Sequence, residues 1–368
     1  MLGFEIKAQD RRTGARFGVL RTQHYKIETP LFMPVATKGS VKYISNEELE
    51  GLGIQALISN AFILYLKPGL EIIKKAGGLH KFMGWKRGLF ADSGGFQLLS
   101  KDFLISTNER GINFRNPFDG SKEFFTPEKC IEIQNCLNND IAMALDDVPH
   151  YGKSRQDIAG ALSHTIEWAR RFKKANKNEK QLLFGISQGG TYKDLRKKGI
   201  EKLNEMDFDG IALGGLCIGE PKQKMLEISK YSKKFIPESK PVYLMGVGSA
   251  KDILDSIALG VDVFDSCFPT RTARHCMAIT SKGNIQIEKG KFAKVFSPLD
   301  RDCGCYVCRN HSIAYLHHLV KTKEENGLKY LSYHNLYYTQ NLIEKSKKAI
   351  KEGRFAQFKR EFLGNNAT

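Results

Sequence analysis

The sequence predicts an α/β fold, a (β/α)8 TIM barrel that carries a zinc-binding subdomain towards its C-terminus. Eight short apolar segments alternate with amphipathic helical stretches, which is typical of a parallel sheet. Polar residues directly follow most of these segments, and the length of 368 residues suits one barrel with an insertion. We therefore expect a single domain over residues 1–368, with the zinc-binding subdomain at about 290–340 followed by C-terminal helices.

The expected strands are short and rich in β-branched and other apolar residues. They cover residues 31–36, 56–60, 88–92, 140–146, 182–188, 210–214, 241–246 and 261–265. Residues 154–176 show helical periodicity, and Ser154 is a suitable N-cap for that helix. After the eighth strand we expect a β-like stretch and then helical segments over 311–322 and 335–362.

The polar residues at the strand ends favour a closed barrel over an open sheet. They are Asp92, Asp146, Gln188, Gly215, Gly248 and Asp265. In a closed barrel the C-terminal ends of the strands converge on one face, where active sites are built. Asp and Gly also form turns after strands, which would explain any one of these residues but explains the series poorly.

The composition indicates a water-soluble protein with an anionic partner. The formal net charge is +17, and Lys and Arg side chains that meet phosphates release condensed counterions. There is no apolar run long enough for a membrane span, and residues 1–10 do not resemble a signal peptide. We expect a cytoplasmic protein with no membrane partner. A nucleic acid would account for the charge, but basic enzymes that bind no nucleic acid also occur, so net charge alone leaves both alternatives open.

Three of the eight cysteines form a CxCxxC motif at Cys303, Cys305 and Cys308. They are too close together to pair as disulfides, and this spacing is typical of zinc ligands. His334 is a candidate fourth ligand, although three other histidines, His311, His317 and His318, lie nearer in the sequence. A Cys3His set fills all four positions of one Zn²⁺, so the metal would be structural.

Two strand ends carry carboxylates suited to a flat heterocyclic ligand. Asp92 is followed by Ser93 and by two glycines that allow close approach of the backbone, with Phe96 available to stack. Asp146 and Asp147 can accept hydrogen bonds from the amino and ring N–H groups of a purine. Each motif taken alone is also compatible with an ordinary turn.

The remaining strand ends add a side-chain amide, backbone N–H groups beside glycines, and a further carboxylate. Gln188 and Gly215 lie in Gly-Gly segments whose N–H groups can bind a ligand carbonyl. Asp265 is followed by a loop with Arg271 and Arg274, and guanidinium groups beside a carboxylate suit a phosphate-bearing substrate. A salt-bridged structural loop is the alternative here.

Taken together, these motifs resemble the tRNA-guanine transglycosylases (queuine tRNA-ribosyltransferases) of bacterial type over nearly the whole chain. The segments that carry the resemblance are residues 28–34 (ETPLFMP), 65–69 (YLKPG), 92–97 (DSGGFQ), Asp146, 188–190 (QGG), 214–216 (GGL), 243–248 (YLMGVG), 264–265 with 269–271, and CxCxxC with His334. The resemblance identifies His334 as the fourth zinc ligand.

The resemblance implies a catalytic barrel, a pentosyltransferase of queuosine biosynthesis. Asp265 would attack C1′ of the ribose at the anticodon wobble position, and Asp92 would transfer protons to and from the bases. Guanine in a tRNA with a GUN anticodon would be exchanged for the prequeuosine base 7-aminomethyl-7-deazaguanine or for queuine. The residues implied to bind the base are Asp92, Ser93, Phe96, Asp146, Gln188, Gly215, Leu216 and Met245.

The resemblance also implies an RNA-binding surface and a homodimer. The residues implied to contact RNA are Gly246, Val247, Gly248, Ser249, Ala250, Lys251, Asp252, Thr270, Arg271, Thr272, Ala273 and Arg274. Four positions depart from the usual family residues. Val148 favours queuine whereas the bulky Ile218 disfavours it, so the incoming base stays open, and Ser266 and Ile63 have no explanation in the sequence.

Two other functions compete with this interpretation. The first is a noncatalytic tRNA-binding partner subunit of the same fold, against which the presence of both Asp92 and Asp265 speaks. The second is a zinc-dependent barrel hydrolase, which needs an open coordination position that a Cys3His site lacks.

Overall fold

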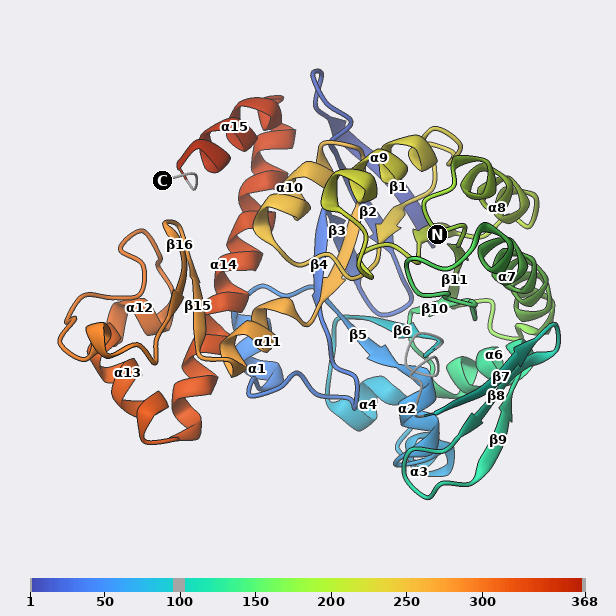
Figure 1. The fold of residues 1–368 in the computed structure, drawn as a ribbon, viewed down its shortest axis with the longest axis horizontal. Coiled ribbons are helices and arrows are strands. Elements are labelled where there is room, and N and C mark those ends of the chain that lie inside the picture. Colours follow the sequence, from blue (N-terminus) through green and yellow to red (C-terminus); the bar gives the residue numbers. More distant parts are fainter. Residues whose placement is uncertain (1, 95–102, 366–368) are drawn as a thin grey trace.

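Eight parallel strands form the centre of the computed structural model, which describes residues 2–94 and 103–365 (Figure 1). In the order of the sheet they are β4 (Leu31–Pro34), β14 (Val263–Ser266), β13 (Val242–Leu244), β12 (Gly210–Leu213), β11 (Leu182–Ser187), β10 (Ile141–Met143), β6 (Gly88–Asp92) and β5 (Ala56–Asn60). A parallel bridge between Val35 and Ile58 joins the two end strands. The predicted (β/α)8 barrel is confirmed, and each predicted strand overlaps one of these.

Apolar side chains fill the inside of the barrel. Met33, Phe90, Phe184 and Tyr243 belong to one buried cluster, in which Phe90 meets Phe184 and Tyr243 edge to face. The sequence did not predict the antiparallel sheet of β1 (Gly3–Gln9), β2 (Arg16–Arg21) and β3 (Lys26–Thr29). Its Leu20 and Ile27 join the same cluster, so this sheet closes the N-terminal end of the barrel.

Helices surround the barrel. They are α1 (Asn46–Gly51), α2 (Ala61–Leu66), α3 (Leu70–Lys75), α4 (Leu79–Met83), α6 (Pro127–Leu137), α7 (Arg155–Ala175), α8 (Lys193–Glu205), α9 (Lys222–Lys233), α10 (Ala250–Ile257) and α11 (Phe268–Arg274). The predicted helix over 154–176 is confirmed as α7, where Ser154 and Asp157 form a capping box. Across the described residues, no helix combines the length and apolar character that a membrane crossing requires.

A second antiparallel sheet follows β6 and was also not predicted. Its strands are β7 (Leu104–Asn108), β8 (Gly111–Arg115) and β9 (Lys122–Phe125). Phe114 and Phe125 pack edge-on against Phe62 of α2, with ring centroids 4.8 and 5.4 Å apart. These contacts attach the sheet to the barrel wall beside α2.

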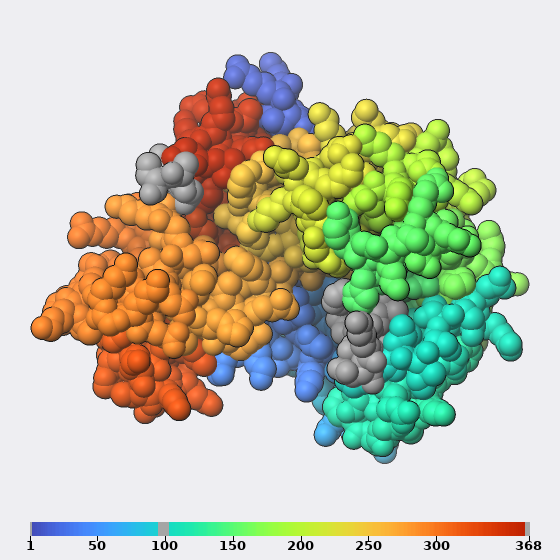
Figure 2. All heavy atoms as spheres, viewed as in Figure 1, coloured from blue at the N-terminus to red at the C-terminus, as the bar shows by residue number. Residues whose placement is uncertain are grey.

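Residues 277–321 form a lobe at the opposite end of the long axis from β7–β9 (Figures 1 and 2). It contains β15 (Met277–Thr280), β16 (Gly283–Gln286), η1 (Gly290–Phe292), α12 (Tyr306–Asn310) and α13 (Ile313–Lys321). The long helix α14 (Glu325–Lys351) then returns to pack against β4 and α11. The lobe is therefore inserted between the last barrel strand and the helix that covers the barrel beside it.

The helix predicted over 335–362 is wrong in its bounds. Helix α14 already begins at Glu325, and a separate helix, α15 (Phe355–Asn365), follows it. Gly353 adopts a left-handed conformation with φ of 66°, and the N–H of Arg354 bonds to the Ala349 carbonyl. This glycine-based C-cap ends α14, and Phe355 N then donates to the Asp10 carboxylate at 3.0 Å.

Candidate functional site

A cavity of about 490 Å³ opens at the C-terminal ends of the barrel strands, within the size range of small-ligand sites. It brings together many residues that the sequence singled out. These are Asp92, Asp146, Gly215, Leu216, Met245, Gly246, Asp265, Arg271 and Arg274. The strand ends therefore converge on one pocket, as the barrel topology requires.

Asp265 lies at the end of β14 and is held in a fixed orientation. Its Oδ1 accepts hydrogen bonds from Tyr243 Oη at 2.6 Å and from the backbone N–H of Gly246 at 2.9 Å. Burial raises the pKa of Asp265, and these two hydrogen bonds lower it by less. Among the described residues both donors bind Oδ1, which leaves Oδ2 for a ligand.

Asp92, at the end of β6, is electrostatically coupled to Asp265. Burial and then the negative charge of Asp265 raise the pKa of Asp92 to about 7, against opposing hydrogen bonds from the backbone of Gly94 and Ser93. Asn60 Nδ2 lies 3.4 Å from Asp92 Oδ2. A carboxyl with this pKa can both give and take a proton near neutral pH.

Asp146 forms the third acidic position of the cavity. Its Oδ2 accepts from Gln188 Nε2 at 2.7 Å, so Gln188 lies behind Asp146 and does not itself line the cavity. Burial and then the charge of Asp92 raise the pKa of Asp146 to about 7. Gly215 has φ of 62°, and a Cβ there would lie 2.2 Å from Gln188 Oε1, so only glycine fits.

Arg196 of α8 supports this wall from behind and was not predicted. It is fully buried, and its guanidinium donates to the carbonyls of Ser187 and Gly214 at 2.8 Å and of Gly190 at 2.7 Å. These bonds connect the loops after β11 and β12. In the sequence Arg196 stands among surface lysines and gives no signal of this role.

Several predicted site residues lie elsewhere. Ser93 is buried beside Asp92 and does not line the cavity, and Phe96 lies outside the described residues. Asp147 turns away towards α7, where its carboxylate pairs with His164 Nδ1 at 2.9 Å. Tyr243 is a site residue that the sequence does not predict, because a tyrosine in a strand usually packs as core.

The segments expected to contact RNA border the cavity, and their contacts stay predictions. The side chains of Val247, Thr270 and Ala273 are buried, so only their backbone would be available to a ligand. Ser249 caps α10 and donates to Asp252 at 2.6 Å. Arg271 and Arg274 line the cavity and are the arginine or lysine residues nearest to Asp265 along the chain.

We expect the buried carboxyl of Asp92 to lower the free energy of unfolding near neutral pH, and Asp92→Asn tests this. A folded-state pKa raised from 3.8 to about 7 means that the folded chain binds more protons, so stability falls as pH rises through that range. At pH 8 the variant should be more stable than the parent by about 1–3 kcal/mol, and the gain should shrink towards pH 4. Urea unfolding at both pH values measures it; a gain that grows on acidification would contradict the prediction.

The zinc motif gathers into one cluster in the C-terminal lobe. His334 Nδ1 lies 3.6, 3.5 and 3.4 Å from the sulfur atoms of Cys303, Cys305 and Cys308. Tetrahedral zinc, with bonds of about 2.3 Å to sulfur and 2.0 Å to nitrogen, separates such atoms by about 3.5 Å. His334 Nε2 lies 2.8 Å from the Ile279 carbonyl, which directs the Nδ1 lone pair towards the thiols.

The other histidines are excluded from this cluster. His317 Nδ1 instead faces the Ile287 carbonyl at 2.7 Å, and the His311 ring packs at a tilt against the rings of Tyr315 and Tyr330. Within residues 2–94 and 103–365, the four atoms of Cys303, Cys305, Cys308 and His334 lie within 4.8 Å of one another and could hold a metal ion. The donor set therefore fits one tetrahedral metal with no open position.

The family model for queuine tRNA-ribosyltransferase matches residues 10–368. The chain belongs to this family of pentosyltransferases. A queuine tRNA-ribosyltransferase of Caldanaerobacter subterraneus subsp. tengcongensis is 48% identical over 98% of this chain and 96% of its own length. Those of Halothermothrix orenii and Lysinibacillus sphaericus are 46% and 44% identical, over 98% of this chain and 97% and 95% of their own lengths.

Three of the four residues that the sequence singled out as departures lie at the same cavity. Val148, Ile218 and Ser266 all line it. A Cβ at Gly248 would lie 2.6 Å from the Cβ atoms of Ser266 and Phe268, so residue 248 has to be glycine. Ile63 instead packs partly buried against the outer core, away from the cavity lining.

Proposed function

We propose that this family member is a tRNA-guanine transglycosylase that replaces guanine at the wobble position of GUN-anticodon tRNAs with a 7-deazaguanine base. One observation supports this most: Asp92 and Asp265 share one cavity, each with a distinct set of hydrogen bonds. Two carboxyl groups in different environments suit one nucleophile and one proton carrier.

In the first half-reaction Asp265 Oδ2 attacks C1′ of the target ribose. A C1′–O bond forms and the glycosidic C1′–N9 bond breaks, and the departing guanine takes the proton of Asp92. Tyr243 Oη and Gly246 N donate hydrogen bonds to Oδ1. They hold the carboxylate in one orientation, so that Oδ2 already faces C1′ before the reaction. The result is a covalent ester between Asp265 and the tRNA.

In the second half-reaction the deazaguanine enters the vacated base position. Asp92, now ionised, takes the N9 proton while N9 attacks C1′ and the Asp265 carboxylate leaves. Two inversions at C1′ restore the original configuration, as in retaining glycosidases. A pKa near 7 lets Asp92 serve as acid in one half and as base in the other.

The wall opposite these groups has the donors and acceptors that a guanine edge needs. Asp146 can accept from the exocyclic amine and a ring N–H, and backbone N–H groups at Gly215 and Leu216 can donate to the base carbonyl. Gln188 holds Asp146 in place, and Met245 offers an apolar face to the ring. Extraction of the base is cheaper from a single-stranded anticodon loop than from a duplex.

Arg271→Ala should weaken tRNA binding. Arg271 is exposed at the cavity mouth and can meet a backbone phosphate. We expect the KM for tRNA to rise roughly tenfold and the slope of log K against log salt to fall by about one. Steady-state kinetics over a salt series measures both. Lys282→Ala, in the turn between β15 and β16 of the C-terminal lobe, is the control. An unchanged salt slope for Arg271→Ala would argue against a phosphate contact.

We propose that the Cys3His cluster holds one structural Zn²⁺, which supplies folding energy and no chemistry. Removing the metal with a chelator should lower the melting temperature by roughly 10 °C, the shift expected from about 3–5 kcal/mol. Cys305→Ser should behave like the chelated parent, whereas Cys136→Ser, at a thiol far from the cluster, should not. An unchanged melting temperature after chelation, with loss of the metal verified by elemental analysis, would refute a structural metal.

Guanine exchange tests the proposed activity directly. The chain alone, expected to act as a homodimer, should incorporate labelled guanine into tRNA with a GUN anticodon and not into one with a changed wobble base. A noncatalytic partner subunit would bind the tRNA without incorporation. Competition by 7-aminomethyl-7-deazaguanine and by queuine then identifies the incoming base, with Ile218→Gly as the variant expected to admit the larger one.

A further inference from the structure

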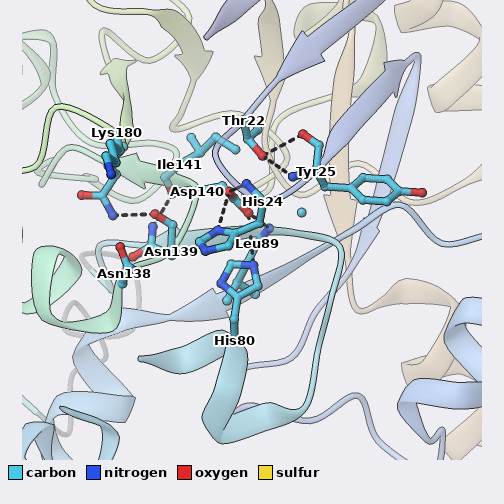
Figure 3. A network of polar contacts seen from close by, with 12 residues as sticks. Thr22, His24, Tyr25, His80, Leu89, Asn138, Asn139, Asp140, Ile141 and Lys180 are labelled. Atoms are coloured by element: carbon cyan, nitrogen blue, oxygen red, sulfur yellow. Dashed lines mark hydrogen bonds and ion pairs between the residues drawn. The ribbon is translucent and has the colours of Figure 1, made fainter. Parts of the chain in front are cut away.

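Figure 3 shows a second cluster of metal-ligating side chains. It lies where barrel strands begin, and so at the end of the barrel opposite the active-site cavity. His24 is in the turn between β2 and β3, His80 is on α4, and Asp140 directly precedes β10. Three segments that are far apart in the sequence therefore meet at one point. The exchange reaction proposed above uses none of them.

Both imidazole rings point at the same carboxylate. His24 Nδ1 lies 3.0 Å from Asp140 Oδ1, and His80 Nε2 lies 3.2 Å from Asp140 Oδ2. The two rings are 4.0 Å apart between centroids, and one nitrogen or oxygen of each residue lies within 4.8 Å of the others. Bonds of about 2.1 Å to one metal would separate such donor atoms by about 3.0–3.4 Å.

The carboxylate is held in place independently of the histidine rings. The backbone N–H of Leu89 donates to Asp140 Oδ2 at 2.9 Å, and that of His24 donates to Oδ1 at 3.0 Å. Each oxygen keeps a further lone pair towards the imidazoles. Backbone hydrogen bonds of this kind orient carboxylates that ligate metals.

The cluster is accessible from solvent on the side of His24. The Asp140 side chain is fully buried and that of His80 is 10% exposed, whereas 27% of the His24 side chain is exposed. The buried Nδ1 of His80 has no hydrogen-bond partner among the described residues. Nε2 faces two acceptors, the Arg87 carbonyl at 3.0 Å and Asp140 Oδ2 at 3.2 Å, so it carries the ring proton in the metal-free chain. A metal ion would bind Nε2 by displacing that proton to the unpartnered Nδ1.

We propose that His24, His80 and Asp140 form a second metal site, which binds a divalent first-row transition ion such as Zn²⁺. Two imidazoles and one carboxylate suit this class of ion, and solvent reaches the remaining position through the exposed side of His24. The ion would clamp the β2–β3 turn, and with it the sheet that closes the barrel, to α4 and β10. The alternative is a His–Asp–His hydrogen-bond network without affinity for metal.

Metal counting on the full chain separates the two possibilities. The protein is first loaded with zinc at the Cys3His cluster and then dialysed against low micromolar Zn²⁺. We expect about two zinc ions per chain for the parent and for His318→Ala, an exposed histidine on α13, and about one for His24→Ala. His80→Gln should weaken the second site at least about tenfold.

Co²⁺ added to the zinc-loaded protein provides a second readout. Binding by nitrogen and oxygen ligands gives weak visible bands, whereas entry into the Cys3His cluster adds intense thiolate charge-transfer bands. We expect only the weak bands in the parent and none in His24→Ala. A parent that binds about one zinc ion, a second equivalent that survives in both His24→Ala and His80→Gln, or cobalt seen only at thiolates overturns the proposal.

Discussion

Asp265→Asn is expected to abolish guanine exchange, with kcat lowered by at least about 1,000-fold. The amide oxygen can still accept from Tyr243 Oη and Gly246 N, so the site should keep its geometry. The amide lacks the anionic oxygen that attacks C1′, and no covalent intermediate can form. A radiolabelled guanine-exchange assay measures the loss.

Two controls separate this loss from misfolding. Asp147→Asn changes a neighbouring carboxylate that faces His164 and α7, and exchange should stay within a few-fold of the parent. Asp265→Asn itself should bind tRNA with unchanged affinity and retain its metal. Exchange by Asp265→Asn within about tenfold of the parent would reject Asp265 as the nucleophile.

Asp92→Asn is expected to lower exchange by about 10²–10⁴-fold, the usual contribution of a general acid–base group. In the parent, guanine release in a single turnover needs protonated Asp92, so the rate should fall as pH rises above about 7. The amide cannot titrate, so the variant should lose the decline above pH 7. Any remaining pH dependence should have the opposite sign, because Asp146 accepts from the base only when it is ionised. Rapid-quench measurements of guanine release between pH 5.5 and 8.5 follow both.

The pH profile carries the more specific test of Asp92. If the variant keeps the same decline above pH 7, another group supplies the proton. The same substitution should stabilise the fold at pH 8, so a loss of activity together with a gain of stability is the expected signature. A structural role for Asp92 would instead lower both.

Much of the fold follows from local pattern. All eight barrel strands were predicted because buried parallel strands are short apolar runs, and α7 because its apolar face and Ser154 cap are both visible in the sequence. The sheet of β1–β3 was missed, since β2 is buried on almost its whole length and shows no alternation. The single helix expected over 335–362 failed at Gly353, because a left-handed C-cap depends on one residue.

The site residues at the ends of barrel strands could be predicted from their position in the chain alone. Asp92 and Asp265 lie at the ends of strands and Asp146 just beyond one, and barrel topology brings strand ends together. Tyr243 and Arg196 were not predictable, because their roles depend on partners from other strands and helices. The fourth zinc ligand was ambiguous on spacing alone, and the contacts of His317 with Ile287 and of His334 with the three thiols now separate the candidates.

The covalent ester at Asp265 is the most direct measurable consequence of the proposed mechanism. The parent protein is incubated with a GUN-anticodon tRNA without an incoming base, denatured, and digested with ribonuclease and protease for mass spectrometry. We predict a nucleotide adduct, lacking its guanine, on the peptide that contains Asp265. An adduct on the Asp92 peptide, or exchange without any adduct, would contradict the assignment of Asp265 as nucleophile.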